Sequence, residues 1–141
     1  MYASHQNQMS AKIQQRGMIP NWKGKVALVV EDDYISYKII EKYLHPTEIG
    51  LLWVKNGEDA FRACENQLPD IALVDIRLPR INGLEFLRWA KQNHQMLPVI
   101  IQTAYGLSES RRECHNAGCD GFLAKPFDKG LLIQQMLEVF N

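Results

Sequence analysis

Short apolar runs alternate with amphipathic stretches from about residue 24 to the end of the chain. Each run is nearly continuous and rich in β-branched side chains, which is typical of strands buried on both faces of a parallel sheet. A stretch with helical periodicity follows each run, and the runs are KVALVV, LLWVK, IALVD, PVIIQT and GFLA. Five such units predict an α/β fold, a doubly wound five-stranded parallel sheet with helices on both faces.

Helices are predicted over the intervening stretches, the first over Tyr34–Leu44. Asn82, with Glu85 three residues later as its capping-box partner, is predicted to cap one helix, and Asp128 is predicted to cap the last. We expect an apolar face on the first helix, comprising Ile35, Ile39, Ile40 and Tyr43. The other helices are predicted over Gly57–Gln67, from Asn82, over Ser108–Ala117 and after Asp128.

The length of 141 residues suits one compact domain. Residues 1–23 are polar and lack a sustained apolar period, so we predict an N-terminal tail or linker there and the domain over 24–141. The 16 lysines and arginines equal the 16 aspartates and glutamates, which leaves no positive field to attract nucleic acid. The chain ends at Asn141 directly after the last predicted helix, so we expect no DNA-binding segment and no direct contact with nucleic acid.

The three cysteines, Cys64, Cys114 and Cys119, are odd in number and include no C-x-x-C pair. This pattern indicates neither a disulfide framework nor a zinc site, and it favours a reducing compartment. The sequence also contains no apolar stretch of the length of a secretory signal or a membrane span. We therefore expect a cytoplasmic protein.

Acidic residues follow the first predicted strand and end the third. Glu31, Asp32 and Asp33 come directly after Val30, and Asp75 ends the run IALVD. In this architecture ligands bind at the carboxyl ends of the strands, so these carboxylates should converge. Like charges at that distance repel one another unless a hard cation such as Mg²⁺ neutralises them. The triplet by itself is equally consistent with acids that stabilise the N-terminal end of the next helix.

A hydroxyl and an ammonium group are predicted at the same edge. Thr103 ends the fourth strand, and Lys125 follows the fifth. Phosphoryl transfer depends mainly on positioning and charge neutralisation, and it needs a nucleophile, a cation site and donors to the phosphoryl oxygens. Asp75, the acids, Thr103 and Lys125 would supply these parts.

At this point the sequence resembles the receiver domains of two-component signalling. The resemblance covers about residues 24–141 and rests on four motifs in the order and spacing of that family, VVEDD, LVDIRLPRINGLE, QTA and KPF. It implies the flavodoxin-like fold of CheY, with strand order 2-1-3-4-5.

The resemblance implies that Asp75 is the phosphorylated aspartate. It also implies an Mg²⁺ site and assigns its ligands to Glu31, Asp32, Asp75 and the backbone carbonyl of Arg77. Thr103 and Lys125 would bind the oxygens of the phosphoryl group. The peptide bond between Lys125 and Pro126 would be cis.

Two further pairs of positions are implied. Thr103 and Phe122 would form the switch, in which the threonine moves toward the phosphoryl group and the aromatic ring follows. A plain core role for Phe122 is equally compatible with the sequence. Arg77 and Tyr105 fall where the family flanks the path of the hydrolytic water, and we expect them to lengthen the lifetime of the aspartyl phosphate. In the alternative, both side chains point to solvent and leave the lifetime unchanged.

The resemblance implies a signalling switch that catalyses only its own phosphorylation and dephosphorylation and is otherwise not an enzyme. A histidine kinase or histidine phosphotransfer protein would donate the phosphoryl group, and a downstream protein would bind the face of the fourth helix, fifth strand and fifth helix. In an alternative, the chain is the receiver module of a hybrid histidine kinase, acting mainly as a docking or phosphorelay element. The segment Gly17–Lys25 resembles the linker before such a receiver.

Three other classes of protein fit less well. A flavodoxin-like cofactor binder would place a phosphate loop where Glu31, Asp32 and Asp33 would repel it. A phosphatase of the haloacid dehalogenase type would carry an acid where this chain has Arg77. A pseudo-receiver should have lost the aspartate, an acid or the lysine, and none is missing.

Overall fold

The computed structural model describes residues 19–104 and 107–140. Its strands form one five-stranded sheet in the order β2-β1-β3-β4-β5, and every neighbouring pair is parallel. The predicted strand order and the doubly wound fold are therefore confirmed. The strands are β1 (Val26–Val30), β2 (Gly50–Val54), β3 (Ile71–Asp75), β4 (Val99–Thr103) and β5 (Gly121–Ala124).

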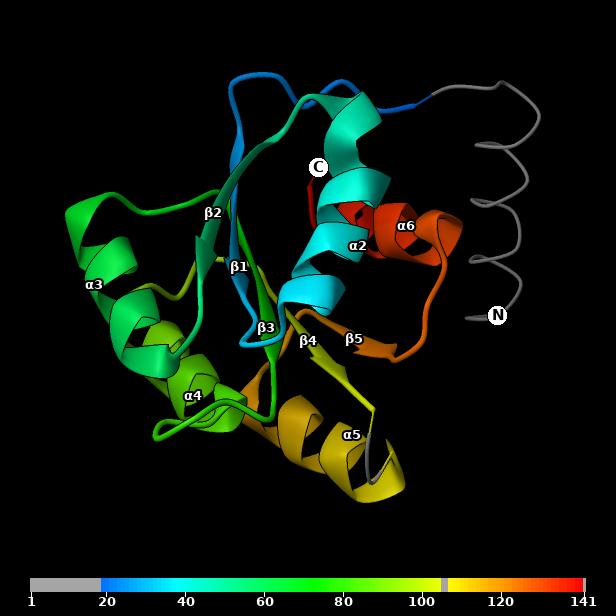
Figure 1. The fold of residues 1–141 in the computed structure, drawn as a ribbon. Helices are drawn as coiled ribbons and strands as arrows, with labels where there is room; N and C mark the ends of the chain where they lie inside the picture. The colour runs from blue at the N-terminus through cyan, green and yellow to red at the C-terminus, as the bar shows by residue number, and fades with distance from the viewer. Residues whose placement is uncertain (1–18, 105–106, 141) are drawn as a thin grey trace.

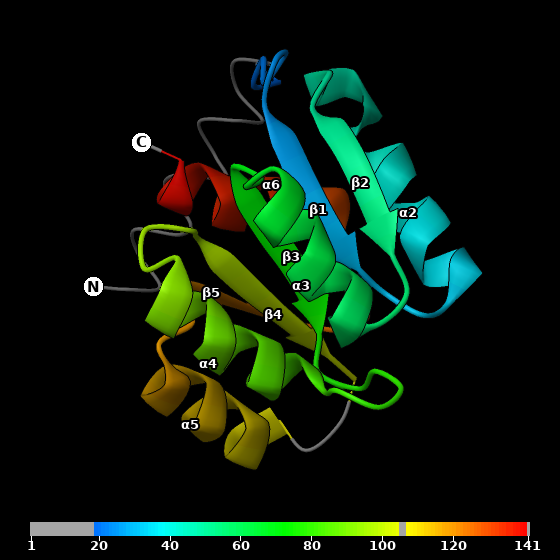
Figure 2. The same ribbon diagram turned by 90° about the vertical axis from the view of Figure 1, so that its left-hand side faces the viewer.

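Helices cover both faces of the sheet (Figures 1 and 2). On one face, α2 and α6 pack over a buried cluster that includes Val29 and Ile100, and on the other, α3, α4 and α5 cover Leu28 and Ile101. Alternate residues of each strand thus point into opposite cores, which explains why the strands are apolar throughout. The helices are α2 (Tyr34–Leu44), α3 (Gly57–Asn66), α4 (Gly83–Asn93), α5 (Leu107–Ala117) and α6 (Lys129–Val139).

The predicted helix ends agree closely with the structure, because their capping signals are local. The Asn82 side chain accepts a hydrogen bond of 2.9 Å from the Glu85 N–H, and Asp128 accepts one of 2.8 Å from the Leu131 N–H. Asp33 caps α2 in the same way through the Ser36 N–H. A short 3-10 helix, η1 (His45–Thr47), was not predicted.

The predicted apolar face of α2 was partly wrong. Ile40 and Tyr43 pack against the core, but Ile35 is 63% exposed and Ile39 is 44% exposed. The inward positions belong instead to Tyr37, Ile40 and Leu44. The Tyr37 ring stacks on Trp53 of β2 at a centroid distance of 4.3 Å. This contact with a distant strand rotates the buried face of the helix away from the two isoleucines.

The segment before β1 joins the core at one residue. Trp22 is buried, its ring centre lies 5.1 Å from that of Phe140, and its backbone N–H donates to the Thr47 carbonyl. Residues 1–18 lie outside the described part of the chain, so the N-terminal tail stays a prediction. Among the described residues, the helices are too short or too polar to cross a lipid bilayer.

Candidate functional site

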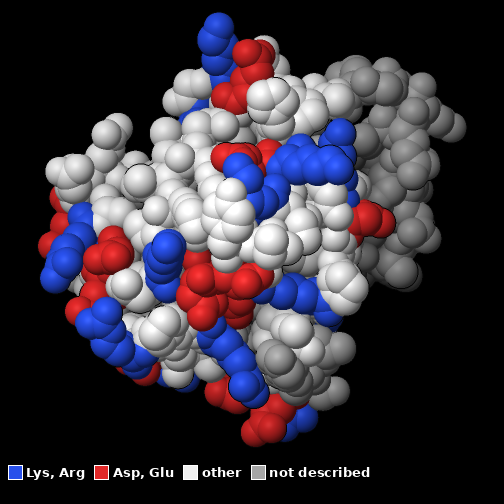
Figure 3. All heavy atoms as spheres, viewed as in Figure 1, with Lys and Arg blue, Asp and Glu red and all other residues white. Residues whose placement is uncertain are grey.

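Three carboxylates meet at the carboxyl edge of the sheet. Glu31 directly follows β1, Asp32 comes next, and Asp75 ends the adjacent strand β3. One oxygen from each carboxylate lies within 4.8 Å of the others. Glu31 and Asp75 are buried, whereas Asp32 is exposed at the rim. Figure 3 shows acidic side chains gathered on the surface at this edge, with basic side chains around them.

Lys125, after β5, is paired with both buried acids. Its Nζ lies 2.7 Å from Glu31 Oε1 and 2.7 Å from Asp75 Oδ2. Burial by itself would lower the pKa of Lys125, but the hydrogen bonds to Asp75 and Glu31 and the negative charges of these acids together outweigh burial and raise that pKa. Burial raises the pKa of Glu31 despite the opposing effect of Lys125. The lysine therefore stays charged and partly neutralises the carboxylates.

The loop after β3 turns back on Asp75. The backbone N–H of Arg77 donates a hydrogen bond of 2.9 Å to Asp75 Oδ1, while the Arg77 side chain is exposed. At the start of α4, the Gly83 N–H donates to the Ile76 carbonyl at 2.9 Å. A Cβ atom on Gly83 would overlap the Asp75 carbonyl oxygen and lie 2.8 Å from the Ile76 Cα. This close approach explains the glycine and fixes the backbone beside Asp75.

The predicted hydroxyl and ammonium groups lie on adjacent strand ends. Thr103 is buried at the end of β4, and its carbonyl accepts a hydrogen bond of 2.9 Å from the Lys125 N–H. The peptide bond between Lys125 and Pro126 is cis, as the resemblance implied. The predicted convergence of Glu31, Asp32, Asp75 and Lys125 is thus confirmed as geometry.

Phe122 is predicted to belong to the switch, and Tyr105 is predicted to affect the lifetime of the phosphoryl group. Phe122, on β5, is half-buried, and the guanidinium carbon of Arg111 on α5 lies 4.8 Å from the centre of its ring. Tyr105 lies outside the described residues.

Sequence reasoning missed the aromatic neighbour of the acids. The indole Nε1 of Trp53 donates a hydrogen bond of 2.7 Å to the Glu31 carbonyl. The Asp33 N–H donates to the carboxylate of the same glutamate at 3.2 Å. The only available signal was an aromatic residue near the end of β2, the neighbour of β1, and that signal predicts packing as readily as a hydrogen bond.

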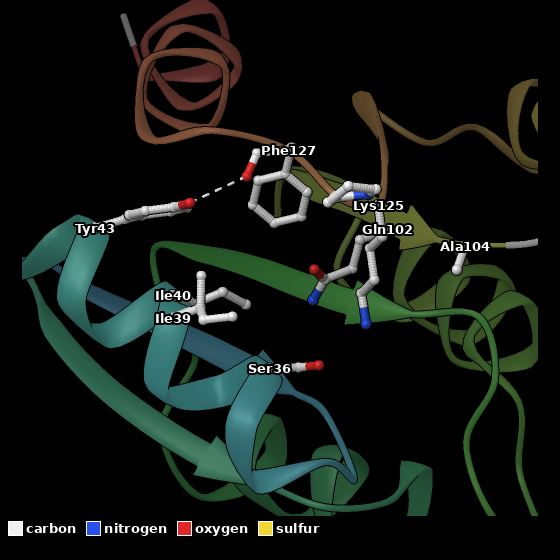
Figure 4. Close-up of a pocket in the computed structure, with 9 residues that line it drawn as sticks. Ser36, Ile39, Ile40, Tyr43, Gln102, Ala104, Lys125 and Phe127 are labelled. Carbon is white, nitrogen blue, oxygen red and sulfur yellow. Dashed lines mark hydrogen bonds between the residues drawn. The ribbon is translucent and has the colours of Figure 1, made fainter.

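A pocket of about 350 Å³ adjoins the site between α2 and the segment after β5 (Figure 4). Lys125 forms part of its wall, and the Gln102 amide points toward α2. Within the described residues, neither polar atom of this buried amide has a hydrogen-bond partner. The lining is otherwise mainly apolar and comprises Ser36, Ile39, Ile40, Tyr43, Ala104, Pro126 and Phe127.

The chemistry of this donor set fits a hard divalent cation, because carboxylate oxygens are the ligands that such cations prefer. A doubly wound sheet with acids and a lysine at its carboxyl edge is the arrangement of a signalling receiver domain. The sequence profile of the response regulator receiver domain matches residues 27–137, and the chain belongs to this family.

A curated relative agrees with this assignment. The DNA-binding transcriptional regulator NtrC of Escherichia coli K12 is 35% identical over 103 residues, which cover 73% of this chain and 22% of NtrC. The chain thus spans about a fifth of that relative's length.

Two solved structures have the same fold. A CheY-like receiver domain protein from Methanospirillum hungatei is 26% identical, with a TM-score of 0.76 over 81% of this chain and 91% of that one. The receiver domain of a sensor histidine kinase from Pseudomonas aeruginosa PAO1 was solved with a magnesium ion coordinated in its active-site cleft. It is 30% identical, with a TM-score of 0.76 over 84% of this chain and 99% of that one.

Proposed function

We propose that this receiver accepts a phosphoryl group on Asp75 in an Mg²⁺-dependent reaction and thereby switches a protein-interaction surface. A histidine kinase or a histidine phosphotransfer protein is the proposed donor. The observation that carries the proposal is the setting of the Asp75 carboxylate. Its Oδ2 lies 2.7 Å from the Lys125 ammonium, its Oδ1 accepts the Arg77 N–H at 2.9 Å, and two further carboxylates lie beside it.

The proposed metal ligands are the side chains of Glu31, Asp32 and Asp75, with the backbone carbonyl of Arg77. Their carboxylate oxygens are close enough to share one ion, and Asp32 gives the group an exposed side. When bound, the ion would supply positive charge against the oxygens of the incoming phosphoryl group.

The transfer itself is assigned to the chain's own residues. An Asp75 carboxylate oxygen attacks phosphorus, the bond from phosphorus to the donor's imidazole nitrogen breaks, and the electron pair stays with the imidazole. The Lys125 ammonium and the Thr103 hydroxyl donate hydrogen bonds to the phosphoryl oxygens. Lys125 is already held 2.7 Å from Asp75, so little reorganisation is needed.

The test uses the protein, MgCl₂ and acetyl phosphate, a small donor that needs no docking surface. The intact mass should rise by one phosphoryl group in the wild type and not in Asp75→Asn, and excess chelator should prevent the change. An unchanged wild-type mass, or an equal increase in the variant, would overturn the proposal.

For the switch, we propose that the Thr103 hydroxyl moves to the phosphoryl group and that Phe122 follows it. Phosphorylation adds nearly two negative charges, which the hydroxyl can satisfy only at close range. The output surface would be the face of α5, β5 and α6, where Arg111 covers the Phe122 ring. Hydrogen exchange over β5 should change on phosphorylation of the wild type but not of Thr103→Val, and equal changes in both would contradict this assignment.

The protein donor is proposed to dock on the first half of α2. Tyr34, Ile35 and Ile39 are apolar yet 44–63% exposed, and α2 begins just after the acids. Ile39→Asp should slow phosphorylation by a histidine phosphotransfer protein about tenfold, which is an ordinary loss for one docking residue. The same variant should react normally with acetyl phosphate. The control is Met96→Asp, at an exposed residue in the turn before β4, where the amino-terminal ends of the strands lie. Equal slowing by both variants would exclude docking on α2.

A second candidate is a receiver module of a hybrid histidine kinase. It is favoured by the similarity to a sensor kinase receiver over 99% of that domain. Such a module would pass its phosphoryl group from Asp75 to a histidine phosphotransfer protein. Loss of the label from phosphorylated protein should then be faster with that protein present, and an unchanged rate would favour the stand-alone switch. Either candidate is proposed to act in the cytoplasm without contacting nucleic acid directly.

A further inference from the structure

Two of the three cysteines meet at the end of α5, away from the acidic site. The helix ends in a Schellman motif, with Gly118 in the left-handed conformation at φ +91°. The Gly118 N–H donates to the His115 carbonyl at 3.1 Å, and the Cys119 N–H donates to the Cys114 carbonyl at 3.0 Å. In this motif the two residues joined by the bond that spans five residues also bring their side chains together, and here both of these residues are cysteines.

The two thiols are chemically unequal. Cys114 is fully buried, and Cys119 is half-buried. A hydrogen bond between the two sulfur atoms lowers the pKa of Cys119, and it outweighs the opposing effects of burial and of the Asp120 carboxylate. The same hydrogen bond and burial raise the pKa of Cys114. Cys119 is therefore the better nucleophile, with a second thiol in contact behind it.

We propose that Cys114 and Cys119 form a reversible dithiol–disulfide site that reacts with hydrogen peroxide. A partly exposed, acidic thiol beside a resolving thiol is the arrangement that peroxide-sensitive sites use. The site is independent of the phosphoryl-transfer function and uses none of its residues.

The proposed chemistry has two steps. The Cys119 thiolate attacks one peroxide oxygen, the O–O bond breaks, and the departing hydroxide takes up a proton to leave as water. The Cys114 sulfur then attacks the resulting sulfenic acid, the S–O bond breaks and a second water leaves. In sum, two thiols lose two hydrogen atoms and one peroxide becomes two waters.

Reversal by cellular thiols follows from the position of the pair. The loop closed between Cys114 and Cys119 is short, so the crosslink removes little entropy from the unfolded chain. A disulfide that gains little stability from folding is readily reduced by thiol exchange. This agrees with the cysteine pattern, which indicates no permanent disulfide framework.

Oxidation would act where α5 meets β5. The next residue, Asp120, is firmly held, because its side chain accepts hydrogen bonds from the Val99 N–H at 2.8 Å and from Lys91 Nζ at 2.6 Å. A disulfide would tie the end of α5 to this fixed point.

The first test measures the product. The full chain is treated with one equivalent of hydrogen peroxide, and its intact mass is compared before and after dithiothreitol. The wild type and Cys64→Ser should each lose two hydrogen atoms reversibly, and peptide mapping should find Cys114 joined to Cys119. Cys119→Ser should not form the disulfide. A disulfide that includes Cys64, or no reversible loss of mass, would overturn the proposal.

The second test uses only the wild type, so it does not depend on whether a serine variant folds. In the untreated wild type at pH 7, iodoacetamide should modify Cys119 at least about tenfold faster than Cys64, since thiolate is the reactive form. Burial raises the pKa of Cys64 to about 11, which makes it the matched slow control. Equal rates, or faster modification of Cys64, would contradict the assignment of Cys119 as the attacking thiol.

Discussion

Lys125 provides the positive charge that two buried carboxylates share. Lys125→Met should slow phosphorylation by acetyl phosphate about 100-fold, because a preorganised donor to the phosphoryl oxygens is lost. The same change should tighten Mg²⁺ binding, because the acids lose their competing cation. Phosphorylation can be followed by intact mass and Mg²⁺ binding by calorimetry. Lys38→Met, on the exposed surface of α2, is the control, and loss of both activities in Lys125→Met would instead indicate a collapsed site.

Gln102 is the least satisfied buried residue beside the site. Both polar atoms of its side chain lack a partner among the described residues, and the residue is 2% exposed. Gln102→Leu should raise the free energy of unfolding by about 1–3 kcal/mol, because an unsatisfied buried amide costs roughly that much. Urea denaturation measures the difference, with the exposed Gln95→Leu as control. A loss of stability would show that the amide has a partner in solution.

Arg77 and Tyr105 are the residues proposed to set the lifetime of the phosphorylated state. Arg77 follows Asp75 by two residues, and its N–H is bonded to the Asp75 carboxylate, so its side chain starts beside the reaction path. Replacing both residues with alanine should shorten the lifetime on the order of tenfold, equivalent to about 1.4 kcal/mol of barrier. Decay of the phosphoprotein mass measures it, with Arg88→Ala on α4 as control. Equal lifetimes in the wild type and the double variant would exclude crowding.

At the scale of the element, α4 begins directly after the loop that holds Asp75. Asn82 caps this helix through the Glu85 N–H. Asn82→Ala should lower the free energy of unfolding by about 1 kcal/mol, because the cap satisfies an otherwise orphaned N–H. Asn82→Asp should retain the wild-type stability, since aspartate caps equally well. Chemical denaturation of the wild type and the two variants measures the free energy of unfolding. Equal destabilisation by both substitutions would show that Asn82 does not stabilise the helix by capping it.

Elements whose signals are local were predictable. The runs IALVD and GFLA are β3 and β5 with the same bounds, and Tyr34–Leu44 is α2. The orientation of α2 was not predictable from its periodicity, because a stacked contact between Tyr37 and Trp53 joins residues from different elements.

At the scale of the whole molecule, convergence of the candidate site was predictable because parallel strands end at one edge. The chain positions of Asp75, Thr103 and Lys125 were enough for that. The sequence could not predict how far each acid is buried, with Glu31 buried and Asp32 exposed. The burial of Glu31 depends on its contacts with Trp53 and Lys125, which come from other elements. The cysteine pair was missed because a search for C-x-x-C ignores contacts made by a helix terminus.

A bound cation should stabilise the entire domain, because the three carboxylates come together only in the folded state. With free Mg²⁺ at 100 times its Kd, the free energy of unfolding should rise by about 2.7 kcal/mol. Urea denaturation with and without chelator measures this increment. Asp32→Asn should lose the increment while remaining folded without metal, because Asp32 is exposed and its removal relieves repulsion. Glu65→Gln, an exposed acid on α3, should keep the full increment, and an equal loss in both variants would place the ion elsewhere.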